Sequence, residues 1–438
     1  MALIGRWTVN DQLTEECSTL RHGPYLNTMH LFAAFSILIT LSALFAYINH
    51  RYIKLPSVIG LMLLALILSM VLIATSRLFP GMVEGVREVI ETTGFSDLLM
   101  DSMLGFMLFA GAIHIKLDEL KQEKWAVMLL STVSVITSTL LVGFIVKALL
   151  GLFGIEVELI HALLFGSLIS PTDPIAVLGI LKEAKVPRSL EMKIAGESLF
   201  NDGVAVVVFL TLLAISQDPG GMGVADIATL FAHEAGGGIL WGLLIGYAGF
   251  LLMRSIDNYK IEVLLSLAVV MGGYSFAHVI HVSGPLAMVA AGILIGNHGK
   301  ELAMSDLTLE YVDKFWELID EILNAVLFVL IGLELLVIDI DPLHVGIGGI
   351  GIGVVLVIRY FSVWLPVQFL RFKQRITRGT LIMLTWGGLR GGISIAMALS
   401  LPVGSGRELW ITLTYVIVAF SILVQGLTVG RVAKKVKL

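Results

Sequence analysis

The sequence predicts an all-α polytopic membrane protein, and three observations carry this prediction. Of its 438 residues, 57% are hydrophobic and only 14% are charged. The mean hydropathy is +0.93. A water-soluble domain cannot hide so much apolar surface, because part of any folded surface stays exposed. The apolar residues also gather in runs of about 20, which is the length a helix needs to cross about 30 Å of hydrocarbon.

The apolar runs divide the chain into thirteen predicted spans with no soluble domain between them. They lie near residues 30–48, 55–75, 97–115, 125–150, 158–180, 194–215, 226–252, 261–281, 283–297, 318–338, 343–370, 379–401 and 408–430. The ninth is the shortest. Residues 1–28 are polar, and we expect them to form an extramembrane arm. Cys17, the only cysteine, gives no basis for a disulfide or a cysteine-rich metal site.

The distribution of basic residues predicts the orientation. Thirteen spans place the two termini on opposite sides. With the C-terminus in the cytoplasm, 21 Lys and Arg residues fall on the inside and 5 on the outside. Because cytoplasmic loops carry the excess of basic residues, the pattern predicts an inner-membrane protein with its N-terminus outside. Residues 431–438 would then form a short basic cytoplasmic tail.

Span five contains the sequence Ser170-Pro171-Thr172-Asp173-Pro174. Pro171 and Pro174 each remove a backbone donor and clash with the preceding turn, so an unbroken helix is not expected here. Broken helices supply half-helix ends and free carbonyl groups that can coordinate cations. Thr172 and Asp173 would lie at the break. The alternative is a simple proline kink in which Asp173 caps the inner half-helix.

Span six places polar groups on one face of an apolar helix. Ser198, Asn201 and Asp202 fall within about 100° of arc. Asp202 and Asp173 each lie about nine residues from the cytoplasmic end of their span, so the two carboxyl groups share a depth near the midplane. Oxygen ligands of this kind suit hard cations such as Na+. A buried hydrogen-bond network is the alternative, but ionisable groups inside a membrane usually mark ion or proton paths.

Two arginines lie deep within later spans. Arg390 stands among four glycines in the sequence of residues 387–392, and Arg359 lies in span eleven. We predict that Arg359 forms a buried ion pair with Glu197 that orders the site. Arg390 is predicted to be a fixed positive charge where the two broken helices cross.

Other ionisable residues receive no transport role from the sequence. Asp320 and Glu321 are expected near the inner end of span ten, facing water or capping the helix, with Glu334 near its outer end. Three histidines inside or beside spans are also left out of the site, although their pKa values near neutrality suit pH sensing. They are His114, His278 and His281.

The interrupted spans suggest an internal symmetry. Span five is the fifth member of a first six-span repeat at 29–215, and span twelve is the fifth member of a second at 258–430. Residues 216–257 form a connecting span. The first spans of the two repeats run in opposite directions, so the repeats are inverted. Paired interrupted spans in inverted repeats indicate a transporter site near the midplane.

Residues 170–174 followed by 196–203 (Gly-Glu-Ser-Leu-Phe-Asn-Asp-Gly) resemble the signature of the cation:proton antiporters, in the NhaP/NHE-type sodium/proton exchanger branch. Residues 387–391 are similar to its later glycine–arginine motif. The resemblance covers essentially the whole hydrophobic chain. Only about eight residues follow the last span, which points to the prokaryotic members. The resemblance implies a dimerisation domain, a moving core domain, elevator-like alternating access and a homodimer.

The resemblance also implies residue roles. Asp202 would bind cation and proton in turn, with Asp173, Thr172 and Ser198 lining or supporting the cation site. Asn201 stands where the electrogenic branch carries a second aspartate. The remaining pair, Glu197 with Arg359, is similar to the family's structural ion pair.

The prediction is therefore a secondary active antiporter that exchanges Na+ or Li+ for H+, with Asp202 and Asp173 as Na+ ligands. A single working carboxylate predicts electroneutral exchange. No enzymatic activity, resident cofactor or nucleic-acid partner is expected; the ligands are monovalent cations and protons. Four alternatives stay open at this stage: a K+/H+ antiporter, a cation channel, an intramembrane protease using the two aspartates, and a proton-pump subunit.

Overall fold

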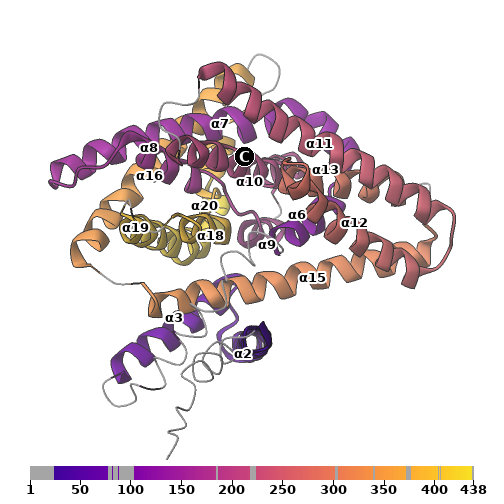
Figure 1. Cartoon of the computed structure of the whole chain (residues 1–438), viewed down its shortest axis with the longest axis horizontal. Coiled ribbons are helices and arrows are strands. Elements are labelled where there is room, and N and C mark those ends of the chain that lie inside the picture. Colours follow the sequence, from indigo (N-terminus) through magenta and orange to yellow (C-terminus); the bar gives the residue numbers. More distant parts are fainter. Residues whose placement is uncertain are drawn as a thin grey trace, which may run out of the picture.

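The structure, a computed structural model, describes residues 24–76, 81, 87, 103–183, 186–217, 223–300, 304–338, 341–370, 376–402, 404 and 406–436. Within these residues the chain is helical apart from turns and one isolated bridge between Asp173 and Leu389, which confirms the all-α prediction (Figure 1). Eight described helices are long and apolar enough to cross a membrane. The total of thirteen spans stays a prediction. Most of the predicted arm, 1–23, and the start of the third span, 97–102, lie outside the described residues.

The first two long helices are joined by a tight turn. Helix α2 (Pro24–Ile48) continues into the π-helical turn η1 (Asn49–Ile53), and α3 (Ser57–Thr75) follows. Lys54 takes a left-handed conformation, with φ of 60°, and its N–H donates to the Asn49 carbonyl at 2.6 Å. The Asn49 side-chain amide donates to the Leu55 carbonyl, and its oxygen accepts from the Leu55 N–H. These bonds satisfy the end of the helix before Pro56 starts the next one.

The remaining elements follow in chain order. They are α6 (Leu104–Ile113), α7 (Leu117–Leu152), α8 (Leu159–Leu168), α9 (Ile175–Glu183), α10 (Arg188–Gln217), α11 (Val224–Arg254), α12 (Tyr259–Val279), α13 (Gly284–Leu294), η3 (Ile295–Gly299), α15 (Asp306–Leu333), η4 (Glu334–Leu336), α16 (Pro342–Leu370), α17 (Arg378–Trp386), α18 (Gly392–Leu399), α19 (Arg407–Phe420), η5 (Ser421–Gln425) and α20 (Gly426–Lys435).

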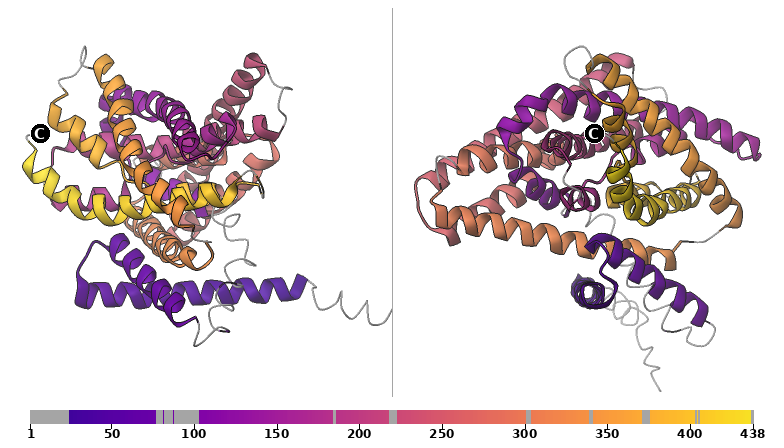
Figure 2. Two further views of the ribbon diagram at one scale, coloured as in Figure 1. Left: turned by 90° about the vertical axis from the view of Figure 1, so that its left-hand side faces the viewer. Right: turned by 180° about the vertical axis from the view of Figure 1, so that it is seen from behind.

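The helices pack in two groups. The α15 group contains α2, α3, α6, α11, α12, α13 and α15, in which α15 packs on α3, α6 and α12. The α10 group contains α7 to α10 and α16 to α20, in which α7 packs on α8, α10 and α16. The groups meet where α10 touches α11 and α13 and where α15 touches α18. Figure 2 shows α2 and α3 on one outer side of the molecule, against α15.

Two helices of the α10 group are broken in their middle. Residues 169–174 separate α8 from α9, and residues 387–391 separate α17 from α18. At the first break, Pro174 has no N–H to give to the carbonyl of Ser170, four residues earlier, so the helix cannot continue. At the second, the glycines favour an irregular chain. The two breaks lie side by side, because the N–H of Asp173 donates to the Leu389 carbonyl at 2.8 Å.

Candidate functional site

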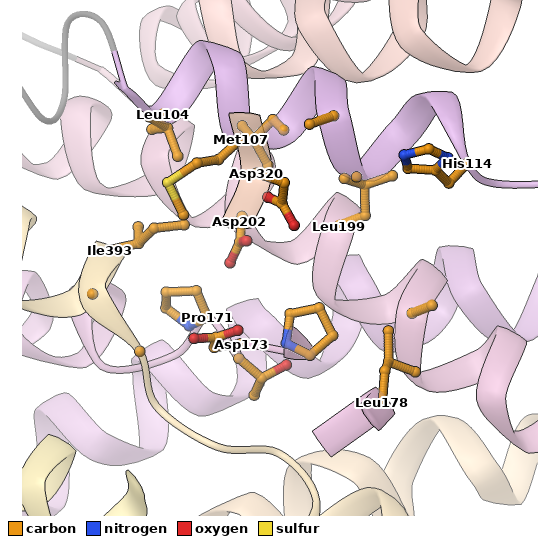
Figure 3. A pocket seen from close by; sticks show the side chains of 18 of the residues that line it. Leu104, Met107, His114, Pro171, Asp173, Leu178, Leu199, Asp202, Asp320 and Ile393 are labelled. Atoms are coloured by element: carbon orange, nitrogen blue, oxygen red, sulfur yellow. The ribbon is translucent and has the colours of Figure 1, made fainter. Parts of the chain in front are cut away.

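A cavity of about 600 Å³ lies where the two groups meet. Its walls come from α6, the first helix break, α10, α15 and the start of α18. Apolar side chains such as Met107 and Leu199 make up much of the lining, and carboxyl groups from three different elements face the interior (Figure 3). The cavity is therefore an apolar pocket with a few convergent charged groups, the usual form of a small-ligand site.

Asp202 lies in the unbroken helix α10 and points into this cavity. The residue is 6% exposed, and its carboxylate has no hydrogen bond to another described residue. Asp173 lines the cavity from the first helix break. In Figure 3, Asp202 lies between Asp320 above it and Asp173 below it. A buried carboxylate without a partner is costly unless a proton or a cation neutralises it.

The other polar residues predicted in the site hold the first break against α10. Asn201 Nδ2 donates to Thr172 Oγ1 at 2.8 Å, and the Thr172 N–H donates to Asn201 Oδ1 at 3.3 Å. Ser198 Oγ lies 3.0 Å from Thr172 Oγ1. Thr172 lines the cavity, whereas Ser198 and Asn201 do not. The amide of Asn201 is thus engaged with the break and is not directed at the cavity.

Arg359 and Glu197 form an ion pair behind the cavity. The distance from Arg359 Nη1 to Glu197 Oε1 is 2.6 Å, and both side chains are almost fully buried. Arg359 Nη2 also donates to the carbonyl of Leu384 in α17, at 2.9 Å. The pair therefore joins α10 to α16 and α17, and it does not line the cavity.

Arg390 lies at the crossing of the two breaks. Its Nη1 donates to the carbonyls of Ser170 at 2.5 Å and Pro171 at 3.0 Å. The first of these is the carbonyl left without a helical partner by Pro174. The backbone N–H of Arg390 donates to Ser421 Oγ at 2.8 Å. A buried guanidinium thus takes the place of missing helical donors, which meets the need of carbonyl groups inside a membrane.

Glycines permit the close approach of the second break. A Cβ atom on Gly391 would lie 2.6 Å from Asp173 Cβ and Oδ2, and one on Gly388 would lie 2.6 Å from Arg359 Nε. Real Cβ contacts do not come so close. A larger residue in place of Gly391 would displace Asp173, and one in place of Gly388 would displace Arg359.

The structure adds residues to the cavity that the sequence analysis assigned no role. Asp313, Glu317 and Asp320 of α15 and His114 at the end of α6 all line it. Asp313 is paired with Lys300 Nζ at 2.5 Å and lies 3.8 Å from His114 Nδ1. The three acidic residues recur at i, i+4 and i+7, which places them on one helix face. This spacing is the sequence signal that indicates an acidic helix face at these positions.

The cavity does not form a compact metal centre. Among the residues that the structure describes, no three His, Cys, Asp or Glu side chains converge as ligands of one metal ion do. Carboxylates spaced along the walls of a partly apolar pocket suit weak, exchangeable binding of a monovalent cation better than permanent capture of a metal.

Comparisons with known proteins give a consistent match. Residues 39–435 match the family described as "Sodium/hydrogen exchanger, transmembrane". The chain is 48% identical over 413 residues to the Na(+)/H(+) antiporter NhaP of Pseudomonas aeruginosa, covering 93% of this chain and 97% of that protein. It is 33% identical over 395 residues to the Na(+)/H(+) antiporter NhaH of Halobacillus dabanensis, covering 88% and 93%. The solved structure of the sodium proton antiporter MjNhaP1 from Methanocaldococcus jannaschii at pH 8 shares the fold, with a TM-score of 0.72 at 19% identity over 94% of this chain and 99% of that one.

Proposed function

Since this chain belongs to the sodium/hydrogen exchanger family, we propose that it is a secondary active antiporter that exchanges Na+ for H+ across the cell membrane. The relatives are named as Na(+)/H(+) antiporters, which favours Na+ over K+ as the substrate. The family is one of transporters and not of enzymes, so the two aspartates are not those of a protease.

One observation carries the proposal at the level of residues: Asp202 is buried, has no hydrogen-bond partner among the described residues, and faces the cavity beside Asp173. A single carboxylate oxygen pair cannot hold a proton and a cation in the same place. We therefore assign Asp202 to bind Na+ and H+ in turn, with Asp173 and Thr172 as neighbouring oxygen donors.

Competition at one carboxylate explains coupling. With Na+ or H+ bound, Asp202 is neutralised, and its site can pass through the apolar part of the membrane. Without a ligand, the bare charge opposes that passage, because burying an uncompensated carboxylate costs several kcal/mol. The protein then returns only when loaded, so each Na+ moved one way requires one H+ moved the other way. The exchange is electroneutral.

The remaining residues hold the site in shape. Asn201 and Ser198 anchor Thr172, and Arg390 binds the carbonyls of the first break. Arg359 and Glu197 fix α10 against α16. These contacts all lie within the α10 group, so that group can move as one body and carry Asp202 with it.

We assign the moving core to the α10 group and the fixed dimerisation part to the α15 group. Elevator-like motion of the first against the second would open the cavity to opposite faces alternately. We further propose an inner-membrane homodimer with its N-terminus outside, as the basic residues predict. In that orientation the end of the cavity marked by His114 and Asp313 opens toward the cytoplasm.

Purified protein in proteoliposomes tests the proposal. The vesicles start acidic inside, and Na+, Li+ or K+ is added outside while the internal pH is followed. The Na+ and Li+ runs are repeated with the membrane potential clamped by K+ and valinomycin. We expect a saturable rise of internal pH with Na+, insensitive to voltage. It should be absent in Asp202→Asn and retained in Glu321→Gln, a control on the exposed side of α15.

Three results would contradict the proposal. A response to K+ alone would change the substrate, and Asp202→Asn with full exchange would remove the assigned carboxylate. Current without saturation would indicate a channel. Size-exclusion chromatography of each variant establishes that it is folded before its transport is compared.

A further inference from the structure

Asp320 has no part in the mechanism above, and we propose that its carboxylate forms a loading subsite for the transported cation, occupied before Asp202 and only while the cavity opens toward the end at which His114 lies. The inference rests on the proposed exchange function. It adds to the site a residue from the helix group that does not carry Asp202.

The position of Asp320 follows from the geometry of α15. Asp313, Glu317 and Asp320 lie on one face of this helix and all line the cavity. At 1.5 Å of rise per residue, Asp320 is about 10 Å further along the helix than Asp313. His114 and Lys300 lie beside Asp313. The side chains of His114 and Asp313 are 40% and 32% exposed, so the acidic face runs inward from this open end of the cavity. Asp320 is its innermost member, next to Asp202 (Figure 3).

The charges along this face are not compensated equally. Asp313 has Lys300 Nζ at 2.5 Å and His114 at 3.8 Å. Asp320 accepts one hydrogen bond, at 3.0 Å, from the neutral amide of Asn324. Among the described residues, no basic side chain lies within ion-pair distance of Asp320. Asp313 at the outer end of this face is thus compensated by a cation, whereas Asp320 further in is not.

A second feature, the environment of Asp202, indicates that the ligand of this pocket is a cation. Asp202 is 6% exposed, faces the same cavity and has no hydrogen-bond partner among the described residues. Asp320, Asp202 and Asp173 are thus three acidic groups around one pocket with apolar walls. Charges of one sign in such a cleft raise the local concentration of the opposite ion. A monovalent cation with part of its water shell fits this set of oxygen donors.

The subsite belongs to one conformation because its two sides belong to different groups. Asp320 lies on α15, which packs on α3, α6 and α12, and Asp202 lies on α10, which packs on α7 and α8. A movement of one group against the other separates the two carboxylates. Asp320 then assists loading from the face seen in this structure and takes no part in loading from the opposite face.

Sided transport assays test this directly. Everted and right-side-out membrane vesicles are prepared from cells without other Na+/H+ exchange, and the apparent KM for Na+ is measured on each face. Asp320→Asn should raise the KM in everted vesicles by about fivefold to tenfold, the loss of one nearby charge in a partly aqueous cavity. In right-side-out vesicles the KM should change by less than about twofold.

Three further variants separate charge from structure. Asp320→Glu keeps the charge and should restore the low KM. Glu317→Gln, at an exposed position nearer the mouth, should give a smaller rise on the same face even if Asp320→Asn folds poorly. Glu321→Gln, outside the cavity lining, should match the wild type on both faces. Immunoblots of the vesicles correct each rate for the amount of protein.

The outcomes are distinct. An unchanged KM in everted vesicles for both Asp320→Asn and Glu317→Gln would overturn the inference. An equal rise on both faces would also overturn it, because a structural defect or a permanent ligand would act in both directions. Absence of Na+-driven exchange in the wild-type protein would instead contradict the proposed function.

Discussion

The backbone N–H of Asp173 donates a hydrogen bond of 2.8 Å to the carbonyl of Leu389. This hydrogen bond joins the break between α8 and α9 to the break between α17 and α18. It is made by the residue whose carboxyl group lines the cavity. The next residue, Arg390, donates hydrogen bonds from its side chain to the carbonyls of Ser170 and Pro171, just before Asp173. The orientation of Asp173 therefore depends on a segment more than 200 residues away in sequence.

Gly391→Ala is expected to abolish most exchange. The added Cβ would meet Asp173 Cβ and Oδ2 at 2.6 Å, so the carboxyl group and the second break must move apart. Overpacking of this kind costs about 1–3 kcal/mol, and we expect the initial Na+-driven rate to fall at least about tenfold. The matched control is Gly349→Ala in α16, where a Cβ meets nothing within 4 Å. Wild-type rates in Gly391→Ala would show that the crossing tolerates displacement.

Thr172→Val should weaken both Na+ binding and stability. It removes the hydroxyl that accepts from Asn201 Nδ2 and bonds Ser198 Oγ, and it leaves the buried amide of Asn201 without that partner. An unsatisfied buried donor costs about 1–3 kcal/mol, measured as a lower midpoint of thermal unfolding in detergent. Thr172→Ser keeps the hydroxyl and is the control. If the two variants unfolded at the same temperature, the hydroxyl network would not support the site.

Glu197→Gln should strongly destabilise the protein. Removing one partner of a buried ion pair leaves Arg359 charged and unpaired, at a cost of about 3–5 kcal/mol. The double variant Glu197→Gln with Arg359→Met removes both charges and should recover part of the lost stability. Lys121→Met, which breaks an exposed pair with Asp118, should change stability by less than about 1 kcal/mol. A double variant less stable than Glu197→Gln alone would contradict a buried-charge penalty.

The helix breaks follow from local chemistry, which is why the sequence predicts them. Pro171 and Pro174 cannot give hydrogen bonds, and four glycines around Arg390 weaken any helix. The apolar runs also predict helices along the chain, and outside the two breaks most of the described residues in these runs are helical. The contact between Asp173 and Leu389 is a different kind of fact, because no local pattern specifies which two breaks meet.

Asp320 shows where sequence reasoning fails. The apolar run of span ten begins near residue 318, which puts Asp320 at its inner end. The helix itself begins at Asp306, so Asp320 lies about 21 Å along it. In this first part of α15, Asp313, Glu317 and Asp320 line the cavity. A hydropathy average reports only how apolar a segment is, so it does not detect a charged helix segment whose carboxyl groups line a cavity inside the bundle.

The central claim is that Na+ and H+ compete for Asp202, and the apparent KM for Na+ as a function of pH tests it most directly. Initial uptake of radiolabelled Na+ into proteoliposomes is measured over a range of Na+ concentrations at each pH. We expect the KM for Na+ to rise as the pH falls, approaching about tenfold per pH unit in the acidic range, while the maximal rate stays constant. A KM that does not change with pH, together with a maximal rate that falls on acidification, would place the proton on a separate group and contradict the account.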